Sequence, residues 1–429
     1  MTRRPWGIFS NIHSRRPLFQ RPALAGLLVP LGLTAALLAA RAAAAPPLAD
    51  PLGLPLPPSL HLAYPALYVL LAPLFSLWDG VSMLSMSRLR DFLAGVAVLY
   101  VAWRAGRVLW HRIVWTDAPP RRTPLRRELG LFAASLAGLV AFVAGGVLWH
   151  RPMAALAGKE PGDVVFDVHS HTNVSHDVRG TLMRGFDTEA NLRWHRRAGF
   201  DAVFVTDHNT VEGLRPHVGP PTLCPGIEVS AWKAHIVLLG DSVPVDRRRY
   251  NGSLDALMTL LRESDSAYGA LSVLSLPEYD DSHWGRLDTL VAAGADGFEI
   301  VNAAPKANEF SRAHRDSVAA LARRVNRFVV GASDIHGWGA TNMVWNVMRL
   351  PGGAAAPAVC AGLLDGLRHG FGSSRIVERH HLRADAGWPG WLTPVAVVWE
   401  TWRGMNGTLT VAWLAWIWLL WAVVRRRYS

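Results

Sequence analysis

The chain of 429 residues is long enough for two or three domains, and half of its residues are hydrophobic. Its formal net charge of +11 comes almost entirely from arginine, because Lys159, Lys233 and Lys306 are the only lysines. The arginines gather beside apolar runs, and the polar middle has no basic stretch interleaved with aromatic residues. The composition therefore favours a lipid bilayer as partner and argues against nucleic acid.

Apolar runs dominate residues 1–155, which we interpret as an N-terminal membrane region. Transmembrane spans are expected near residues 23–40, 61–78 and 129–149. The run at 92–103 has about twelve residues, which is short for a span, so we expect it to be interfacial or re-entrant. Small residues after Arg41 also leave open a cleaved signal peptide in place of the first span.

Residues 156–385 change to short β-rich runs that alternate with helical stretches such as 188–198 and 254–262. This alternation favours an α/β fold with parallel strands and outer helices, in an open sheet or a barrel. Strands are expected at 164–168, 202–206, 236–239, 298–301 and 328–331. Cys224 and Cys360 have no metal-type spacing and indicate no disulfide framework, so both are expected to pack as small apolar side chains.

Residues 386–429 are predicted to form an interfacial helix and a last span. Thr393 can cap the interfacial helix, with Pro394 in its first turn. The span is expected at 408–424, and the tryptophans of this region are expected at the membrane interface.

Arginine-rich segments predict the orientation of the chain, because such segments stay in the cytoplasm. Arginines precede the first apolar run, fill the loop from Arg104 to Arg127, and follow the last run at Arg425–Arg427. With two spans before residue 104, all three segments lie on the inner side of a bacterial-type cytoplasmic membrane. The central domain is then expected on the periplasmic or outer side, whereas a third span at 92–103 would invert it.

Histidines, acidic residues and one asparagine lie beside the expected strands. Those that follow a strand are His169, His171, Asp207, His208, Asn209, Asp334 and His336. Glu228 comes after Pro225 and Gly226, and His235 lies just before the strand at 236–239. The carboxyl ends of parallel strands meet at one face, and residues i and i+2 of an extended stretch point to the same side. His169 and His171 should therefore converge with the others. Imidazole and carboxylate ligands suit zinc, manganese or iron.

Four ordered segments carry these residues. They are Val165–Thr172, Thr206–Thr210, Gly226–Ser230 with His235, and Gly331–His336. Together they resemble the motifs of the polymerase-and-histidinol-phosphatase (PHP) superfamily, and Gly297–Asn302 is similar to a strand that this family places before its last motif. The resemblance covers residues 162–340 and implies a distorted (β/α)7 barrel between the membrane helices.

The resemblance also implies two or three clustered divalent ions, of manganese, zinc or iron. A first ion would be held by His169, His171 and Asp334. A second would be held by His235, with Glu228 bridging the two. A third would be held by His208, His336 and Asp177, with His176 as the alternative to Asp177. Asp207 and Asn209 would orient His208 and its loop.

Two positions depart from the family pattern. Val178 follows Asp177 where the family commonly has a glycine, and the family usually has a histidine before a proline after a later strand. This chain has Leu276 before Pro277, and leucine cannot be a ligand. Glu278, Asp280 or His283 could replace the missing imidazole, or the site could hold fewer ions.

The ligand types imply hydrolysis by metal-activated water, because clustered divalent ions lower the pKa of bound water and stabilise a transferring phosphoryl group. The sequence shows no serine or cysteine nucleophile beside a base. The expected activity is that of a phosphoesterase acting on a small phosphorylated or lipid-linked substrate outside the cytoplasm. An amidase or carbamate esterase, and a catalytically degenerate metal-binding or sensing domain, are the alternatives. The sequence predicts neither the individual substrate nor the oligomeric state.

Overall fold

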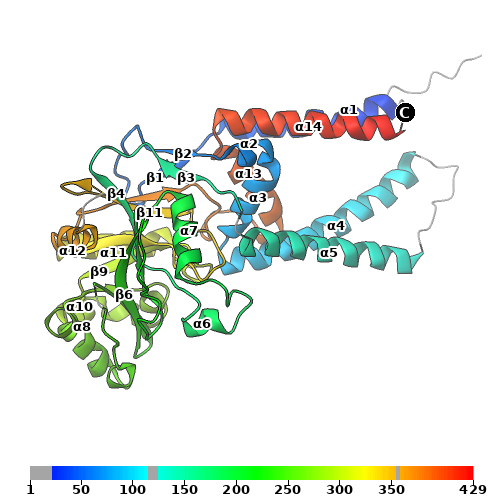
Figure 1. Cartoon of the computed structure of the whole chain (residues 1–429). Coiled ribbons are helices and arrows are strands. Elements are labelled where there is room, and N and C mark those ends of the chain that lie inside the picture. Colours follow the sequence, from blue (N-terminus) through cyan, green and yellow to red (C-terminus); the bar gives the residue numbers. More distant parts are fainter. Residues whose placement is uncertain (1–21, 115–123, 150, 241, 354–357, 429) are drawn as a thin grey trace, which may run out of the picture.

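The computed structural model describes residues 22–114, 124–149, 151–240, 242–353 and 358–428. The basic residues before Pro22, on which part of the predicted orientation depends, lie outside this range. Long helices extend to one side of an α/β part built around a curled sheet (Figure 1).

A mixed sheet of ten strands forms the centre of the α/β part among the described residues. Its order is β1 (Leu48–Ala49), β12 (Arg375–Arg379), β11 (Val344–Arg349), β4 (Asp163–Asp167), β5 (Ala202–Val205), β6 (Thr222–Ala231), β7 (Ala234–Leu239), β8 (Leu271–Leu274), β9 (Gly297–Asn302) and β10 (Phe328–Ala332). A separate pair joins β2 (His61–Ala63) to β3 (Ala155–Ala157). All five expected strands are present, with ends that differ by at most two residues.

The strand directions correct the expectation of a parallel sheet. Strands β4, β5 and β6 run parallel, as do β8, β9 and β10. In contrast, β7 is antiparallel to both β6 and β8, and β11 is antiparallel to β4 and β12. The antiparallel direction of β7 follows from a tight turn after β6. In this turn Lys233 adopts a positive φ of 54°, and the chain returns beside the same strand.

The curl of the sheet brings its β10 end back towards β11. The side chain of Asn346 on β11 accepts a hydrogen bond from Gly331 N at 2.8 Å and donates to Gly331 O at 2.7 Å. It also donates to Phe166 O on β4 at 3.2 Å. A side chain at Gly331 would collide with Val344, so only glycine allows this close approach. The ends of β4 and β10 consequently lie close together.

Helices pack outside the sheet and begin and end at the residues that cap them. The main ones are α7 (Thr188–Ala198), α8 (Leu254–Tyr268), α11 (Arg312–Arg324) and α12 (Val359–Arg368). Helix α7 has the expected bounds, since Asp187 caps its start and Gly199, with a φ of 93°, ends it. Helix α8 continues six residues beyond the expected end at residue 262, to Tyr268. It ends there because Gly269 adopts the left-handed conformation of a C-cap.

The long helices are α1 (Pro22–Ala42), α4 (Met86–Val114), α5 (Leu125–Leu148) and α14 (Gly407–Tyr428). Three segments of the described helices are long and apolar enough to cross a membrane, namely Met86–Leu109, Leu125–Gly146 and Gly407–Arg426. Helix α1 contains a shorter apolar segment, Gly26–Ala42. The spans expected at 129–149 and 408–424 therefore coincide with helices of sufficient length.

Two expectations about the membrane region are wrong. Residues 61–78 do not form one helix, because prolines divide them into β2, α2 (Ala66–Leu70) and the start of α3 (Ala72–Ser82). The run at 92–103, which we expected to be too short, lies inside α4. That helix continues through Arg104 and Arg107, whose guanidinium groups lie over the ring of Trp103.

Helix α13 (Thr393–Arg403) begins where a helix was expected, with Pro394 in its first turn. Thr393 is the first residue of the helix rather than its N-cap, and Leu392 occupies the N-cap position. The helix packs against α1, α3 and α4, at the junction between the long helices and the sheet (Figure 1).

A buried ion-pair network joins this junction together. Asp79 of α3 is fully buried, with Arg151 at 2.7 Å from its Oδ1 and Arg379 of β12 at 2.7 Å from its Oδ2. The hydroxyl of Tyr68 donates to the same carboxylate at 2.8 Å. Because removing one partner of a buried pair leaves an uncompensated charge, this network fixes the helices against the sheet.

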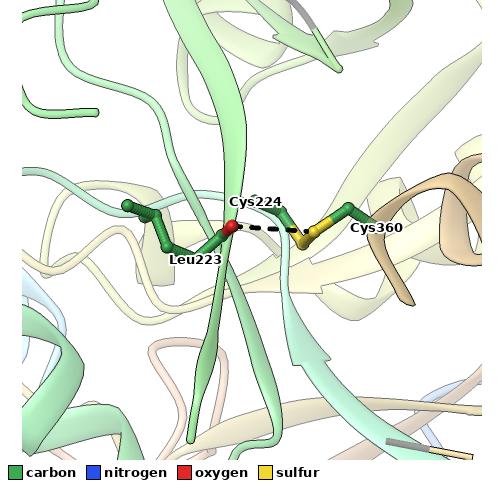
Figure 2. The surroundings of a disulfide bond; sticks show 3 residues. All are labelled: Leu223, Cys224 and Cys360. Carbon is green, nitrogen blue, oxygen red and sulfur yellow. Dashed lines mark hydrogen bonds between the residues drawn. A yellow bond between two sulfur atoms is a disulfide. The ribbon is translucent and has the colours of Figure 1, made fainter. Parts of the chain in front are cut away.

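The prediction for the two cysteines is also wrong. Cys224 of β6 and Cys360 of α12 form a disulfide across a sequence separation of 136 residues (Figure 2). The spacing of two cysteines in sequence carries no information about a partner so distant, which is why the pairing was not predicted. The bond attaches α12 to the middle of the sheet.

Alkylation of the full-length protein tests this bond. We expect no reactive thiol before reduction and two after it, measured by mass spectrometry of the denatured chain. Cys360→Ser should lower the free energy of unfolding by about 2–5 kcal/mol, because the bond restricts the unfolded chain over a long loop. Full alkylation of both thiols without a reductant would contradict the pairing.

Candidate metal centre

The ends of neighbouring strands place eight imidazole and carboxylate side chains together. His169 and His171 follow β4, His208 follows β5, and Asp334 and His336 follow β10. Glu228 and His235 lie on the paired strands β6 and β7, and Asp177 lies on the short helix α6 (His176–Arg179). These are the eight residues expected as ligands.

Their ligand atoms form three overlapping groups in which all atoms lie within 4.8 Å of one another. The first group is His169, His171 and Asp334. The second is His208, Glu228 and His235. The third is His171, Asp177, His208 and His336. The groups match the three expected ion sites, except that His171 and His208 each belong to two of them.

Glu228 lies at the centre of the groups and is 2% exposed. Its Oε2 atom is 3.1 Å from His169 Nε2, 3.3 Å from His171 Nε2 and 3.2 Å from His208 Nδ1. Its Oε1 atom is 3.2 Å from His235 Nδ1. One carboxylate therefore contacts four imidazoles from three separate segments of the chain.

The geometry of these contacts suits metal ligands. Glu228 Oε2 has no hydrogen-bond partner among the described residues, although three ring nitrogens lie within 3.3 Å of it. Atoms that share one ion at roughly 2.0–2.2 Å lie a little over 3 Å apart, as these atoms do. The donor set, nitrogen and carboxylate oxygen, is the one preferred by zinc, manganese and iron. The residues present consequently fit divalent ions.

Glu299 orients His169 and was not among the residues predicted for the site. Its Oε1 lies 2.6 Å from His169 Nδ1, so it holds the ring with Nε2 facing Glu228. A carboxylate in this position fixes the ring and raises its basicity as a ligand. Glu299 is completely buried on β9, and an acidic residue inside an otherwise apolar strand was the available signal.

Asp207 and Asn209 bind the loops that carry the ligands, in keeping with the orienting role expected for them. Asp207 accepts hydrogen bonds from Thr172 N at 2.6 Å and Thr172 Oγ1 at 2.8 Å, just after His171. Asn209 exchanges hydrogen bonds with Ser230, close to Glu228 on β6. Burial raises the pKa of Asp207 to about 6.

Mutual charges shift the pKa values of the histidines in different directions. Burial lowers the pKa of His169, but the charges of Glu228 and its neighbours outweigh burial and hold it well above its usual range. Burial, followed by the charge of His336, lowers the pKa of His171 to about 4. Against the effect of burial, nearby carboxylates raise the pKa values of His235 and His336 to about 9.

The three residues that could replace the imidazole missing at Leu276 lie in different surroundings. Leu276 is 1% exposed and its side chain packs in the apolar core. Asp280 lies 2.8 Å from His314 Nδ1, and His283 contacts backbone carbonyls near the β6–β7 turn. Glu278 alone of the three replacements faces a metal-ligand candidate, with its Oε1 3.8 Å from His235 Nδ1.

No protein-family model and no curated protein sequence matches the chain. Among solved structures, the chain is similar to PsfC from Pseudomonas syringae PB-5123, with a TM-score of 0.37 and 17% sequence identity. That similarity covers 56% of this chain and 96% of PsfC.

The raised pKa values of His235 and His336 predict proton release when ions bind. A ligand imidazole must be neutral, whereas these two keep their protons up to a pH of about 9. Apparent ion affinity should therefore rise with pH until about 9 and level off above it. Calorimetric titration of the full-length protein with Mn²⁺ or Zn²⁺, in buffers of different ionisation enthalpy at pH 7, measures the protons released. Affinity that is independent of pH, with no proton release, would contradict this assignment.

Proposed function

We propose that the chain is a membrane-anchored, metal-dependent hydrolase of the PHP superfamily. The observation that carries the proposal is the contact of Glu228 with four imidazoles, within three groups that could each hold a divalent ion. Seven of the eight residues in these groups belong to the four motifs that resemble the family, in the order in which the family has them, and Asp177 follows the first motif. Histidines that served only to stabilise the fold would not need to gather around one carboxylate.

The curled sheet supports the proposal of a distorted (β/α)7 barrel. Strands β4, β5 and β6 carry one set of ligands, and β10 returns beside them through Asn346. Five of the eight ligands consequently lie at the carboxyl ends of β4, β5 and β10, which is where active sites of parallel α/β architectures are built.

Divalent ions held in this centre would lower the pKa of a bound water and stabilise negative charge on a phosphoryl group. The chain itself fixes the ligands in place before substrate arrives. Glu299 orients His169, and Asp207 secures the loop after His171. Five of the eight ligand candidates are buried, so their charges interact strongly.

A phosphate ester is the substrate class that fits this arrangement best. Two or three divalent ions provide enough positive charge to neutralise a phosphoryl group as well as the carboxylates that hold them. Arg179 is exposed at the end of α6, two residues from Asp177, and is available for a phosphate oxygen. We therefore propose a phosphoesterase acting on a small phosphorylated or lipid-linked substrate.

The test is a substrate panel with full-length protein. Phosphate mono- and diesters, lipid-linked phosphates, carboxylic esters, amides and carbamates should be compared on one metal-loaded preparation. We expect turnover of a phosphate ester that is lost with a chelator and restored by Mn²⁺ or Zn²⁺. The double variant His169→Ala/His171→Ala should lose bound ions and activity, whereas His369→Ala, on a histidine at the end of α12, should keep both.

Each other outcome would replace the proposal with a named alternative. Turnover of carbonyl compounds alone would indicate an amidase or carbamate esterase. Ion binding without turnover of any compound in the panel would favour a metal-binding or sensing domain. Full ion content in the double variant would show that the ligands are wrongly assigned.

We further propose that the α/β part lies outside the cytoplasm. If α1, α4, α5 and α14 each cross the membrane, the basic N-terminus, the basic α4–α5 loop and Arg425–Arg427 all lie on one side. The far ends of these helices point away from the sheet (Figure 1), so the sheet lies on the opposite side. The disulfide supports this orientation independently, since such bonds persist in oxidising compartments.

Labelling of single cysteines in intact cells tests the orientation. Val218 is 98% exposed on the α/β part, and Arg426 lies near the end of α14. Because both native cysteines are in the disulfide, Val218→Cys should react with a membrane-impermeant maleimide in intact spheroplasts. Arg426→Cys should react only after the membrane is permeabilised. The reverse pattern would place the α/β part in the cytoplasm.

A further inference from the structure

The second ion group has an acidic neighbour that the motif resemblance does not provide. The group consists of His208, Glu228 and His235, which is one ligand short of a four-coordinate site. Glu278 Oε1, on α9 (Glu278–His283), which packs against β7, lies 3.8 Å from His235 Nδ1. The Oε1 atom of Glu228 approaches the same nitrogen, so His235 contacts two carboxylates.

The backbone holds Glu278 beside this group. Ser275 N, at the end of β8, donates to His235 O at 3.2 Å, so the chain after β8 passes directly beside His235. Leu276 N donates to Glu299 Oε2 at 3.0 Å, which fixes the next residue and buries its leucine side chain in the core. Glu278 is the next residue along this segment whose side chain carries a ligand atom, and its side chain is 22% exposed.

The two carboxylates are close enough to affect one another. His235 Nδ1 lies 3.2 Å from Glu228 Oε1 and 3.8 Å from Glu278 Oε1, so an ion bound to this nitrogen would lie beside both carboxylates. The 3.8 Å from Glu278 to His235 Nδ1 is within the range for two ligands of one ion, and rotation of the Glu278 side chain can shorten it.

We propose that Glu278 is a ligand of the second ion and replaces the imidazole that Leu276 lacks. This inference rests on the proposed metal-dependent function of the same centre. The second site then has two imidazoles and two carboxylates, from His208, His235, Glu228 and Glu278. Exchanging a neutral imidazole for a carboxylate adds one negative charge and one hard oxygen ligand. Such a site shifts in preference towards Mn²⁺ and away from Zn²⁺.

Ion binding by the full-length protein tests the inference without using activity. Stoichiometry and affinity are measured by elemental analysis and by titration with Mn²⁺ and with Zn²⁺. Glu278→Gln, which keeps the size of the side chain, and Glu278→Ala should each weaken one binding step by about 10- to 100-fold and leave the others unchanged. Glu278→His should retain that step and shift its preference towards Zn²⁺.

Asp280→Ala is the matched control, because this carboxylate lies on the same short helix and faces His314 rather than the centre. It should bind the same ions with the same affinities as the unaltered chain. Circular dichroism and the intact disulfide verify folding of each variant. If Glu278→Gln and Glu278→Ala bind like the unaltered chain, Glu278 is not a ligand, whereas an unaltered chain that binds no ions would overturn the proposed function itself.

Discussion

The position of Glu228 is the constraint on which the rest of the α/β part depends. One buried carboxylate lies against four imidazoles, and a buried charge is tolerated only when it is paired and surrounded by suitable partners. Bringing those partners together requires the end of β4, the end of β5 and the antiparallel pair β6–β7 to converge. Asn346 then closes the curl of the sheet, so that β10 delivers its own ligands to the same place. The strand order, including the unexpected antiparallel β7, is therefore the arrangement that gives Glu228 its neighbours.

The parts of the structure that were predicted are those that a pattern of a few adjacent residues indicates. His169 and His171 follow a strand at a spacing of two, and such local patterns located five of the ten strands of the sheet and seven of the eight candidate ligands. Asp177 was expected from the family resemblance alone. Glu299 was missed because its role depends on a contact with His169, 130 residues away, and an acidic residue in an apolar strand does not by itself indicate its partner. The disulfide was missed for the same reason, since it joins residues separated by 136 positions. Register and strand direction also arise from pairing between distant segments, which the sequence does not display.

The membrane region shows a different limit of sequence patterns. An uninterrupted apolar run indicates a span only if the backbone can stay helical through it, and the prolines in residues 61–78 prevent this. Conversely, α4 extends well beyond its apolar run. Its arginines can be accommodated because their apolar stems lie along the helix and their guanidinium groups lie over the ring of Trp103. The two errors compensate in the proposed topology. One crossing between α1 and the basic loop was expected at 61–78 and is supplied by α4, so the number of crossings, and with it the proposed side of the α/β part, is unchanged.

The network around Asp79 makes the helices part of the same folded unit as the candidate centre. Arg379 lies on β12, which pairs with β11, and β11 pairs with the strand that leads into His169. Strand β1, from the N-terminal region, completes the sheet beside β12, so residues before 155 contribute to the α/β part. A fragment of residues 156–385 would lack β1 and Asp79 and would expose Arg379 and the edge of β12 that they cover. The helices consequently belong to the folded unit that holds the candidate centre. If they cross a membrane as proposed, they would hold the centre at a fixed position relative to the bilayer.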